Sequence, residues 1–162
     1  MWLNAQRTLH YPPERNRVPA HLTLFHHLPP SASDDLCARL KMECKEPAPP
    51  ARISGIMGLG TGNAYRIESP QLDDMRWRLA EAFATLLMAQ DRADWAAHVT
   101  VQNKVKPSVA KVTKDAMAAA FRPRAISVIG LAAYHYRDGP WEEIAGYAFG
   151  SGRKLTATAM GS

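Results

Sequence analysis

The apolar residues recur with changing periods along the chain, and each period predicts a helix or a strand. Apolar residues spaced three and four apart indicate helices, whereas short runs rich in apolar and β-branched residues indicate strands. Ser33 and Ser69 stand where they cap two helices, and Pro12 and Pro13 end another. We expect helices over residues 2–10, 34–46, 69–90 and 107–121 and strands over 21–28, 52–59, 63–68, 97–105, 125–136 and 142–149.

Turn residues divide these elements in a repeated order. The sequence GTG predicts a hairpin between residues 52–59 and 63–68, and RDGPW at 137–141 predicts a second turn. The order strand, helix, strand, strand occurs twice, with the long helix between the copies. Because hairpin-length connections dominate, the pattern predicts an α+β fold of two lobes with mainly antiparallel sheets flanked by helices. We expect one domain over residues 1–150 and a loose C-terminal tail over 151–162.

Each half of the repeat opens with a short polar motif. It reads H-L-T-L at His21 and Thr23 and H-V-T-V at His98 and Thr100. Side chains alternate along a strand, so each histidine shares a face with its threonine and the aliphatic residues take the opposite face. One H-x-T is expected about 0.3 times by chance in this composition, so a single copy means little. The matched second copy favours a chemical role over two buried strands.

These residue types suit acid–base chemistry at a phosphate. Two imidazoles with ordinary pKa values near 6.5 can hold opposite protonation states close to neutral pH. One histidine then acts as base and the other as acid. The threonine hydroxyls can donate hydrogen bonds to phosphate oxygens, where charge builds in the transition state.

The paired motifs at His21 and His98 resemble those of the two-histidine (2H) phosphoesterase superfamily, in particular its 2′-5′ RNA ligase-like or RNA 2′,3′-cyclic phosphodiesterase branch. The resemblance covers most of residues 15–150. It implies a bilobal fold with a pseudo-twofold axis, in which each lobe offers one motif to a central cleft. Members of the family usually carry a strand and a full helix before the first motif. Only twenty residues precede His21, so we expect the N-terminal scaffold strand to be missing and leave the oligomeric state open.

The resemblance also implies an activity. It implies metal-independent opening of 2′,3′-cyclic phosphates on RNA ends or nucleotides to 2′-phosphates, with 2′-5′ RNA ligation as the reverse reaction. His21 and His98 are the implied catalytic residues, Thr23 and Thr100 the implied phosphate-binding residues, and no cofactor or metal is implied. Which histidine is the base stays open. Two alternatives also stay open: a non-catalytic RNA- or nucleotide-binding member, and a 2H enzyme acting on a small cyclic nucleotide.

Composition and charge narrow the class of protein. The chain has 162 residues, 46% hydrophobic and 22% charged, which is the composition of one globular domain and not of a disordered chain. A net charge of +5 and a pI near 9.4 favour an anionic partner such as nucleic acid or a nucleotide. The start lacks a signal-peptide pattern and no apolar run is long enough to cross a membrane, so we expect a cytoplasmic protein.

Other candidate residues are weaker. Cys37 and Cys44 lie seven positions apart on a predicted helix, too far for a disulfide, and are expected as core thiols in a reducing compartment. His26 falls on the opposite strand face from His21, which disfavours a metal site. His27 and Lys104 share the motif face and can reach phosphate or solvent. Several aromatic residues are either platforms for a base or core residues: Phe25, Tyr65, Tyr134, Tyr136 and Trp141.

Overall fold

The computed structural model describes residues 2–136 and 141–155. Its helices are α1 (Trp2–His10), α2 (Ser33–Glu43), α3 (Pro70–Ala82), α4 (Ala89–Arg92) and α5 (Pro107–Ala120), with single 3₁₀ turns at Pro13–Arg15 and Pro30–Ala32. Its strands are β1 (Ala51–Gly58), β2 (Asn63–Glu68), β3 (His98–Gln102), β4 (Arg124–Ile126), β5 (Gly130–Tyr136) and β6 (Trp141–Ala148). These elements confirm the α+β class.

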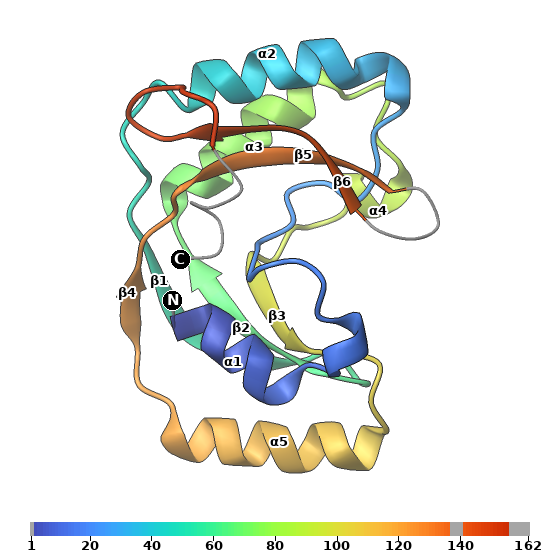
Figure 1. The fold of residues 1–162 in the computed structure, drawn as a ribbon, viewed down its shortest axis with the longest axis vertical. Helices are drawn as coiled ribbons and strands as arrows, with labels where there is room; N and C mark the ends of the chain where they lie inside the picture. Colours follow the sequence, from blue (N-terminus) through green and yellow to red (C-terminus); the bar gives the residue numbers. More distant parts are fainter. Residues whose placement is uncertain (1, 137–140, 156–162) are drawn as a thin grey trace.

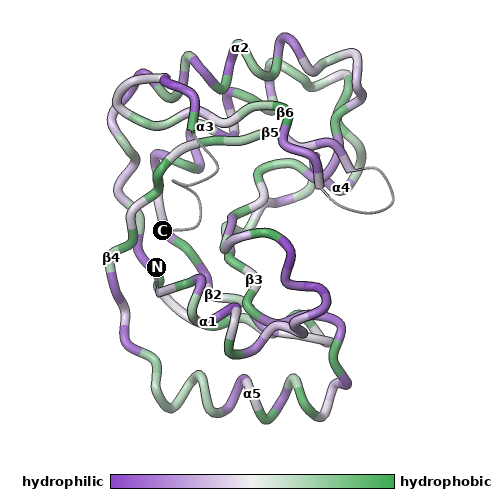
Figure 2. The backbone as a smooth tube through the Cα atoms, in the orientation of Figure 1, coloured by the Kyte–Doolittle hydropathy of each residue, from purple (hydrophilic) through white to green (hydrophobic). Residues whose placement is uncertain are grey.

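The strands form two antiparallel sheets. One has the order β3-β2-β1-β4 and the other consists of the hairpin β5-β6. Figure 1 shows α2 and α3 above the β5–β6 sheet at one end of the molecule and α5 at the other end. Figure 2 shows hydrophobic and hydrophilic residues alternating along α2 and α5, the pattern of helices that pack with one face.

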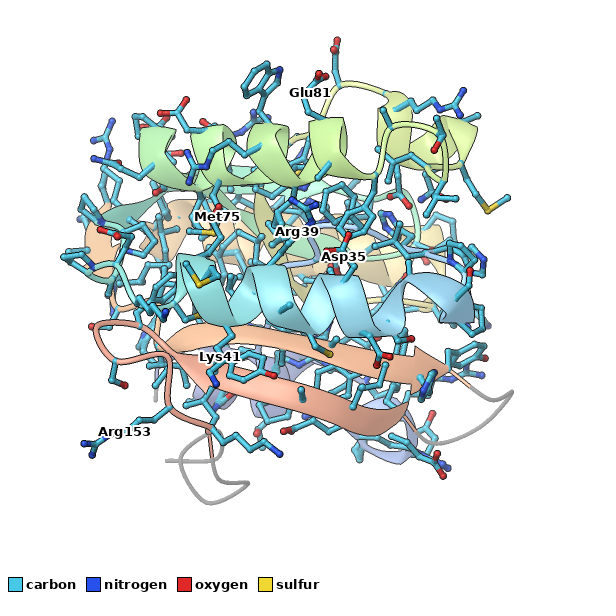
Figure 3. All side chains as sticks on the ribbon, turned by 90° about the horizontal axis from the view of Figure 1, so that it is seen from above. Asp35, Arg39, Lys41, Met75, Glu81 and Arg153 are labelled. Carbon is cyan, nitrogen blue, oxygen red and sulfur yellow. The ribbon has the colours of Figure 1, made fainter. Side chains whose placement is uncertain are left out.

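Two main clusters of buried side chains hold these layers together. The first lies between α2, α3 and the β5–β6 sheet and includes Leu40, Met75 and Tyr147. Figure 3 shows α2 and α3 side by side with Met75 between them. The second cluster packs on the four-stranded sheet and includes Ile53 and Val101, both with no exposed surface. Each motif segment therefore lies next to a packed core.

The two halves of the sequence are interleaved in the fold. The hairpin β1–β2 from the first half pairs with β3, the strand of the second motif. Leu22, Leu24 and Phe25, from the first motif and the residues after it, pack against the core of the β5–β6 hairpin from the second half. Each sequence half thus supports the motif of the other half. The predicted arrangement of two pseudo-symmetric lobes around a cleft stays a prediction.

The predicted strand over residues 21–28 is wrong. This segment forms one isolated bridge, from Leu22 to Val99, and is otherwise irregular. The predicted single strand over 125–136 is also wrong, because β4 and β5 belong to different sheets and the chain crosses between them at residues 127–129. Gly130 begins β5 where a Cβ would lie 2.1 Å from the Tyr147 carbonyl oxygen, so the close pairing there requires glycine.

The helix ends also differ from expectation in two places. The long helix predicted over residues 69–90 stops at Ala82, and the following turns expose Leu86 and bury Leu87. Its predicted cap is confirmed, since the Ser69 hydroxyl accepts a hydrogen bond from the Leu72 backbone nitrogen at 3.3 Å. Ser33 is not a cap but the first residue of α2, because a 3₁₀ turn precedes it.

Several smaller predictions, on a cysteine, the C-terminal tail and membrane spans, can be compared directly with the structure. Cys44 is fully buried, its thiol donates to the Tyr147 carbonyl oxygen at 3.2 Å, and burial raises its pKa to about 11. Residues 151–155, the start of the expected tail, return to β6 through Lys154, which bridges to Tyr147. The remainder of that tail and residues 137–140 of the predicted turn lie outside the described residues. None of the described helices has the length and hydropathy to cross a membrane.

Candidate active site

The two motifs lie beside each other in the structure. The bridge between Leu22 and Val99 is antiparallel, and both side chains face packed core. An antiparallel register with this pair opposed sets His21 across from Thr100 and Thr23 across from His98, all on the face opposite to Leu22. Diagonal neighbours on one face of such a pair lie about 7–8 Å apart, which is the relation of the two histidines. The bridge therefore sets the two motifs side by side, and a site formed by all four residues stays a prediction.

Both histidine rings are oriented by the same local hydrogen bond. The His21 ring nitrogen Nδ1 lies 2.8 Å from the Pro19 carbonyl oxygen, and the His98 Nδ1 lies 2.7 Å from the Ala96 carbonyl oxygen. A carbonyl oxygen only accepts, so Nδ1 is the donor in both rings. In a neutral ring with this tautomer, Nε2 is the nitrogen without a proton. In both motifs Nε2 is thus the ring nitrogen outside this local hydrogen bond.

The surroundings of His21 favour its neutral form. Its side chain keeps access to solvent, yet enough protein packs around it that burial lowers its pKa. The hydrogen bond to the Pro19 carbonyl works in the opposite direction, but the charges of Arg7 and His98 lower the pKa further.

Arg7 on α1 holds the backbone of the second motif. Its side chain is buried, and Nη1 donates to the Thr100 carbonyl oxygen at 2.7 Å while Nε donates to Asn16 Oδ1 at 3.1 Å. The guanidinium also lies over the Tyr11 ring, 4.2 Å from its centroid. Arg7 therefore links helix α1, the segment leading to His21 and the strand opposite His21.

Side chains from α3 and the 89–95 region hold the first motif. Trp95 Nε1 donates to the Thr23 carbonyl oxygen at 3.0 Å, and Arg76 Nε donates to the Leu24 carbonyl oxygen at 3.1 Å. The Arg76 guanidinium lies 5.0 Å from the ring centroid of Phe25 and 5.3 Å from that of Trp95. These groups therefore bond two consecutive backbone carbonyls of the first motif.

Asp91 fixes the chain just after the first motif. Its buried carboxylate accepts from the backbone nitrogen and Nδ1 of His26, both at 2.9 Å, and from the backbone nitrogen of His27 at 3.0 Å. Burial works to raise the pKa of Asp91, but these hydrogen bonds and the nearby His26 outweigh it and lower the pKa. Arg76 Nη2 donates to the Asp91 carbonyl oxygen at 2.7 Å, which joins this residue to the first motif.

Sequence reasoning missed Arg7, Arg76, Asp91 and Trp95. All four act on backbone atoms or ring positions more than fifty residues away in the sequence, a relation that no local pattern reveals. The His26 ring bonds Asp91. Among residues 2–136 and 141–155, no three His, Cys, Asp or Glu side chains are grouped to hold a metal ion.

The other candidate residues lie in different parts of the structure. β3 ends at Gln102, so Lys104 lies in an exposed loop with a left-handed φ of 58° and does not share the motif face. Tyr65 is buried, whereas Tyr136 and Trp141 are exposed and stack at 5.0 Å between ring centroids at the end of the β5–β6 hairpin. Phe25 packs under Arg76 beside the first motif.

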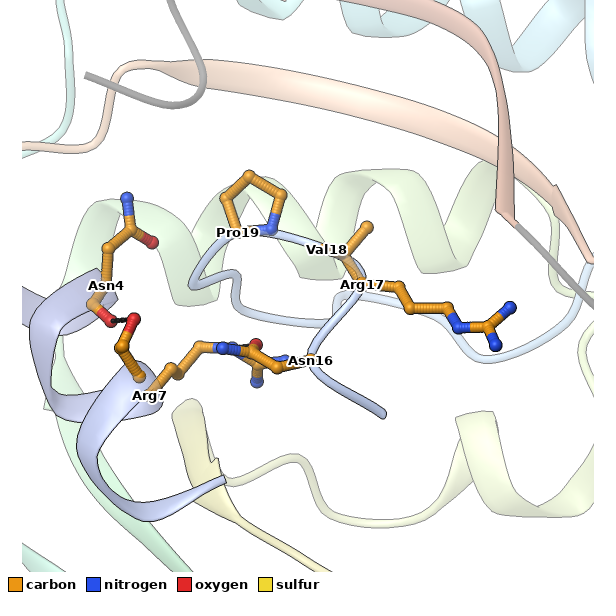
Figure 4. A pocket seen from close by; sticks show the side chains of 7 residues that line it. Asn4, Arg7, Asn16, Arg17, Val18 and Pro19 are labelled. Atoms are coloured by element: carbon orange, nitrogen blue, oxygen red, sulfur yellow. Dashed lines mark hydrogen bonds between the residues drawn. The ribbon is translucent and has the colours of Figure 1, made fainter. Parts of the chain in front are cut away.

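Two cavities flank this site without including either histidine. One, of about 310 Å³, lies between α1 and residues 16–19 and reaches Pro19, whose carbonyl orients His21 (Figure 4). The other, of about 410 Å³, is lined by Arg76, Asp91 and Trp95 among others. Each cavity thus adjoins the scaffold of the first motif.

Comparison with known proteins places this geometry in a family. A solved structure, TT0787 of Thermus thermophilus, is similar over 93% of this chain and 91% of that chain, with a TM-score of 0.55 and 16% identity, which shows a shared fold. No curated protein matches the sequence. The family model described as the 2′-5′ RNA ligase superfamily matches residues 1–140, most of the chain. The chain therefore belongs to the 2′-5′ RNA ligase superfamily, whose members are 2H phosphoesterases.

Proposed function

We propose that the protein is a metal-independent phosphodiesterase that opens 2′,3′-cyclic phosphates to 2′-phosphates. One observation carries the proposal: two His-Thr pairs share one face of adjacent segments, and both rings have Nδ1 bonded to a carbonyl and Nε2 free. Free Nε2 atoms on neighbouring histidines are the arrangement that acid–base catalysis at one phosphorus requires. Membership of the 2′-5′ RNA ligase superfamily supports RNA or nucleotides as the substrate class.

The reaction follows from these side chains. One imidazole takes a proton from water as the water oxygen bonds to phosphorus. The bond from phosphorus to the ribose O3′ breaks on the opposite side, and the second, protonated imidazole gives its proton to O3′. The hydroxyls of Thr23 and Thr100 donate hydrogen bonds to the non-bridging oxygens as charge builds there. When the 5′-hydroxyl of a second RNA replaces water as the nucleophile, the same steps form a 2′-5′ linkage.

We assign His21 as the base in hydrolysis and His98 as the acid. His21 has a pKa lowered by burial, and the buried Arg7 guanidinium nearby disfavours a second positive charge. A ring that stays neutral is available to accept the proton of water. His98, held in the same orientation, then carries the proton that the leaving oxygen needs.

The test uses a dinucleotide that ends in a 2′,3′-cyclic phosphate, with the product identified by ³¹P NMR. We expect the wild-type protein to form the 2′-phosphate, with and without prior EDTA treatment, and His98→Ala to lose turnover while the protein stays folded. His10→Ala at the end of α1 is the matched control and should remain active. Full activity of His98→Ala, or tight binding without any turnover by the wild type, would contradict the proposal.

A further inference from the structure

The cavity beside the first motif has the chemistry of an anion site. Its walls are Asn4, Arg7 and Thr8 on α1 and residues 16–19 on the facing segment. Figure 4 shows Asn4 and Arg7 on one side of the space and Pro19 on the other. The Pro19 carbonyl accepts the Nδ1 hydrogen bond of His21, so one wall of this cavity is the residue that orients the ring we assign as base.

The polar groups of this cavity are donors with a net positive charge. Its lining contains two arginines, two asparagines and a threonine and has no acidic residue. The second cavity, in contrast, is lined by Asp73, Glu81 and Asp91 as well as arginines. Phosphate is bound by arginine and amide donors and repelled by carboxylates, so the cavity at α1 is the one suited to a nucleic acid.

The internal hydrogen bonds of the cavity leave donors for a ligand. Asn4 and Asn16 are bonded through their oxygens, to the Ala20 backbone nitrogen and to Arg7 Nε, which leaves both amide nitrogens as donors. Among the residues that the structure describes, Arg17 makes one side-chain hydrogen bond, in which Nε donates to the Glu14 carbonyl oxygen at 3.4 Å. Its terminal nitrogens extend away from Arg7 at the exposed rim (Figure 4), where a ligand chain that continues out of the cavity would pass.

We propose that this cavity binds the phosphate and ribose of the nucleotide next to the reacting cyclic end, with Arg17 as its contact to that phosphate. The inference rests on the proposed function and deepens it, because it makes an RNA end a better substrate than a cyclic mononucleotide. A volume of about 310 Å³ suits one sugar–phosphate unit and is too small for a duplex. A cyclic mononucleotide has no second phosphate to place there.

Arg17→Ala tests the site against a matched control. Arg15→Ala removes the same charge from the same exposed segment but outside the cavity lining. For each protein, kcat/KM is measured with a cyclic mononucleotide and with a dinucleotide ending in the same cyclic phosphate. We expect Arg17→Ala to lower the preference for the dinucleotide about tenfold or more, the size of one charge-assisted hydrogen bond, with mononucleotide turnover unchanged. Arg15→Ala should leave both rates unchanged.

Equal losses with both substrates, or no loss with either, would overturn the subsite. A binding measurement separates this failure from failure of the proposed reaction. The dinucleotide with a 3′-phosphate is titrated into the wild type, Arg17→Ala and Arg15→Ala. If the wild type opens no cyclic phosphate, weaker binding by Arg17→Ala alone still supports the subsite, and equal binding by all three proteins overturns it. Arg17 is exposed, so its truncation leaves the packed core intact.

Discussion

The two motif segments carry the same residue types, a histidine and a threonine, but different contacts hold their backbones in place. The second motif is part of β3, whose backbone pairs regularly with β2 from Arg66 opposite His98 to Ala64 opposite Thr100. The first motif makes one bridge to β3, and the carbonyls of Thr23 and Leu24 accept hydrogen bonds from the side chains of Trp95 and Arg76. The proposed reaction requires that four side chains be held in place. Strand pairing holds the second motif, and long side chains hold the first.

Arg76 and Arg7, which each bond a motif backbone, differ in the charges near their guanidinium groups. Burial lowers the pKa of the Arg76 guanidinium, and the nearby Asp91 carboxylate opposes this shift. Arg7 forms no ion pair among the residues that the structure describes, and its charge acts on His21. A symmetric pair of histidines therefore lies in an asymmetric field, which is the basis for assigning them different protonation states.

Removing either histidine has the largest expected effect. His21→Ala and His98→Ala should each lower kcat by about 10²–10⁴-fold, because each deletes one general catalyst. Binding of a cyclic dinucleotide should change far less. Single-turnover rates and fluorescence binding measure the two quantities separately. If only one of the variants were impaired, the two segments would not be two halves of one site.

Replacing the threonines tests the equivalence of the segments. Thr23→Val and Thr100→Val keep the side-chain shape and remove the hydroxyl, with an expected loss of about 10²–10³-fold in kcat for each. The reason is the loss of one hydrogen bond to a charged oxygen in the transition state. Strongly unequal losses would show that the irregular first segment does not place Thr23 as β3 places Thr100.

Asp91→Asn should affect the first motif alone. The change removes a charged acceptor of backbone hydrogen bonds from His26 and His27, with an expected loss of about 1–3 kcal/mol in the free energy of unfolding. Because the pKa of Asp91 is lowered by folding, this stability is present above its ordinary value and lost as pH falls through the folded value. The exposed Asp94→Asn is the control, and chemical denaturation at several pH values is the measurement.

An unchanged stability of Asp91→Asn, or an equal loss in the Asp94→Asn control, would show that Asp91 does not anchor this segment. Heteronuclear NMR adds a local readout. The ring resonances of His21 should shift in Asp91→Asn, while those of His98, held by β3, should stay in place.

The smallest expected effect is a shift in the pH–rate profile. The pKa of His21 is lowered, so the acid limb of kcat/KM should lie below pH 6.5, the ordinary histidine value. Arg7→Met removes a nearby positive charge and should move this limb upward by less than about one pH unit. Arg76→Met removes an arginine that lies beside the Asp91 carboxylate and does not act on His21, and it should leave the limb in place. An unmoved limb in a folded Arg7→Met protein would contradict the electrostatic role of Arg7.

Local patterns predicted the elements better than the contacts of the site. Alternation in the sequence assigned Val99 and Val101 to a core face, and the structure buries both. The same alternation predicted a strand at His21, where the structure has only one bridge. A strand needs backbone partners along its length, and here the Thr23 and Leu24 carbonyls bond the Trp95 and Arg76 side chains, which no local pattern identifies.

The most direct test of the central claim is an NMR titration of both histidine rings with inorganic phosphate. The account holds that His21 and His98 face one phosphate site, so their ring resonances should move together and give one dissociation constant. Replacing Thr23 or Thr100 with valine should weaken both responses equally. Response of only one ring, or two different dissociation constants, would mean that the histidines do not share a phosphate and would contradict the proposed reaction.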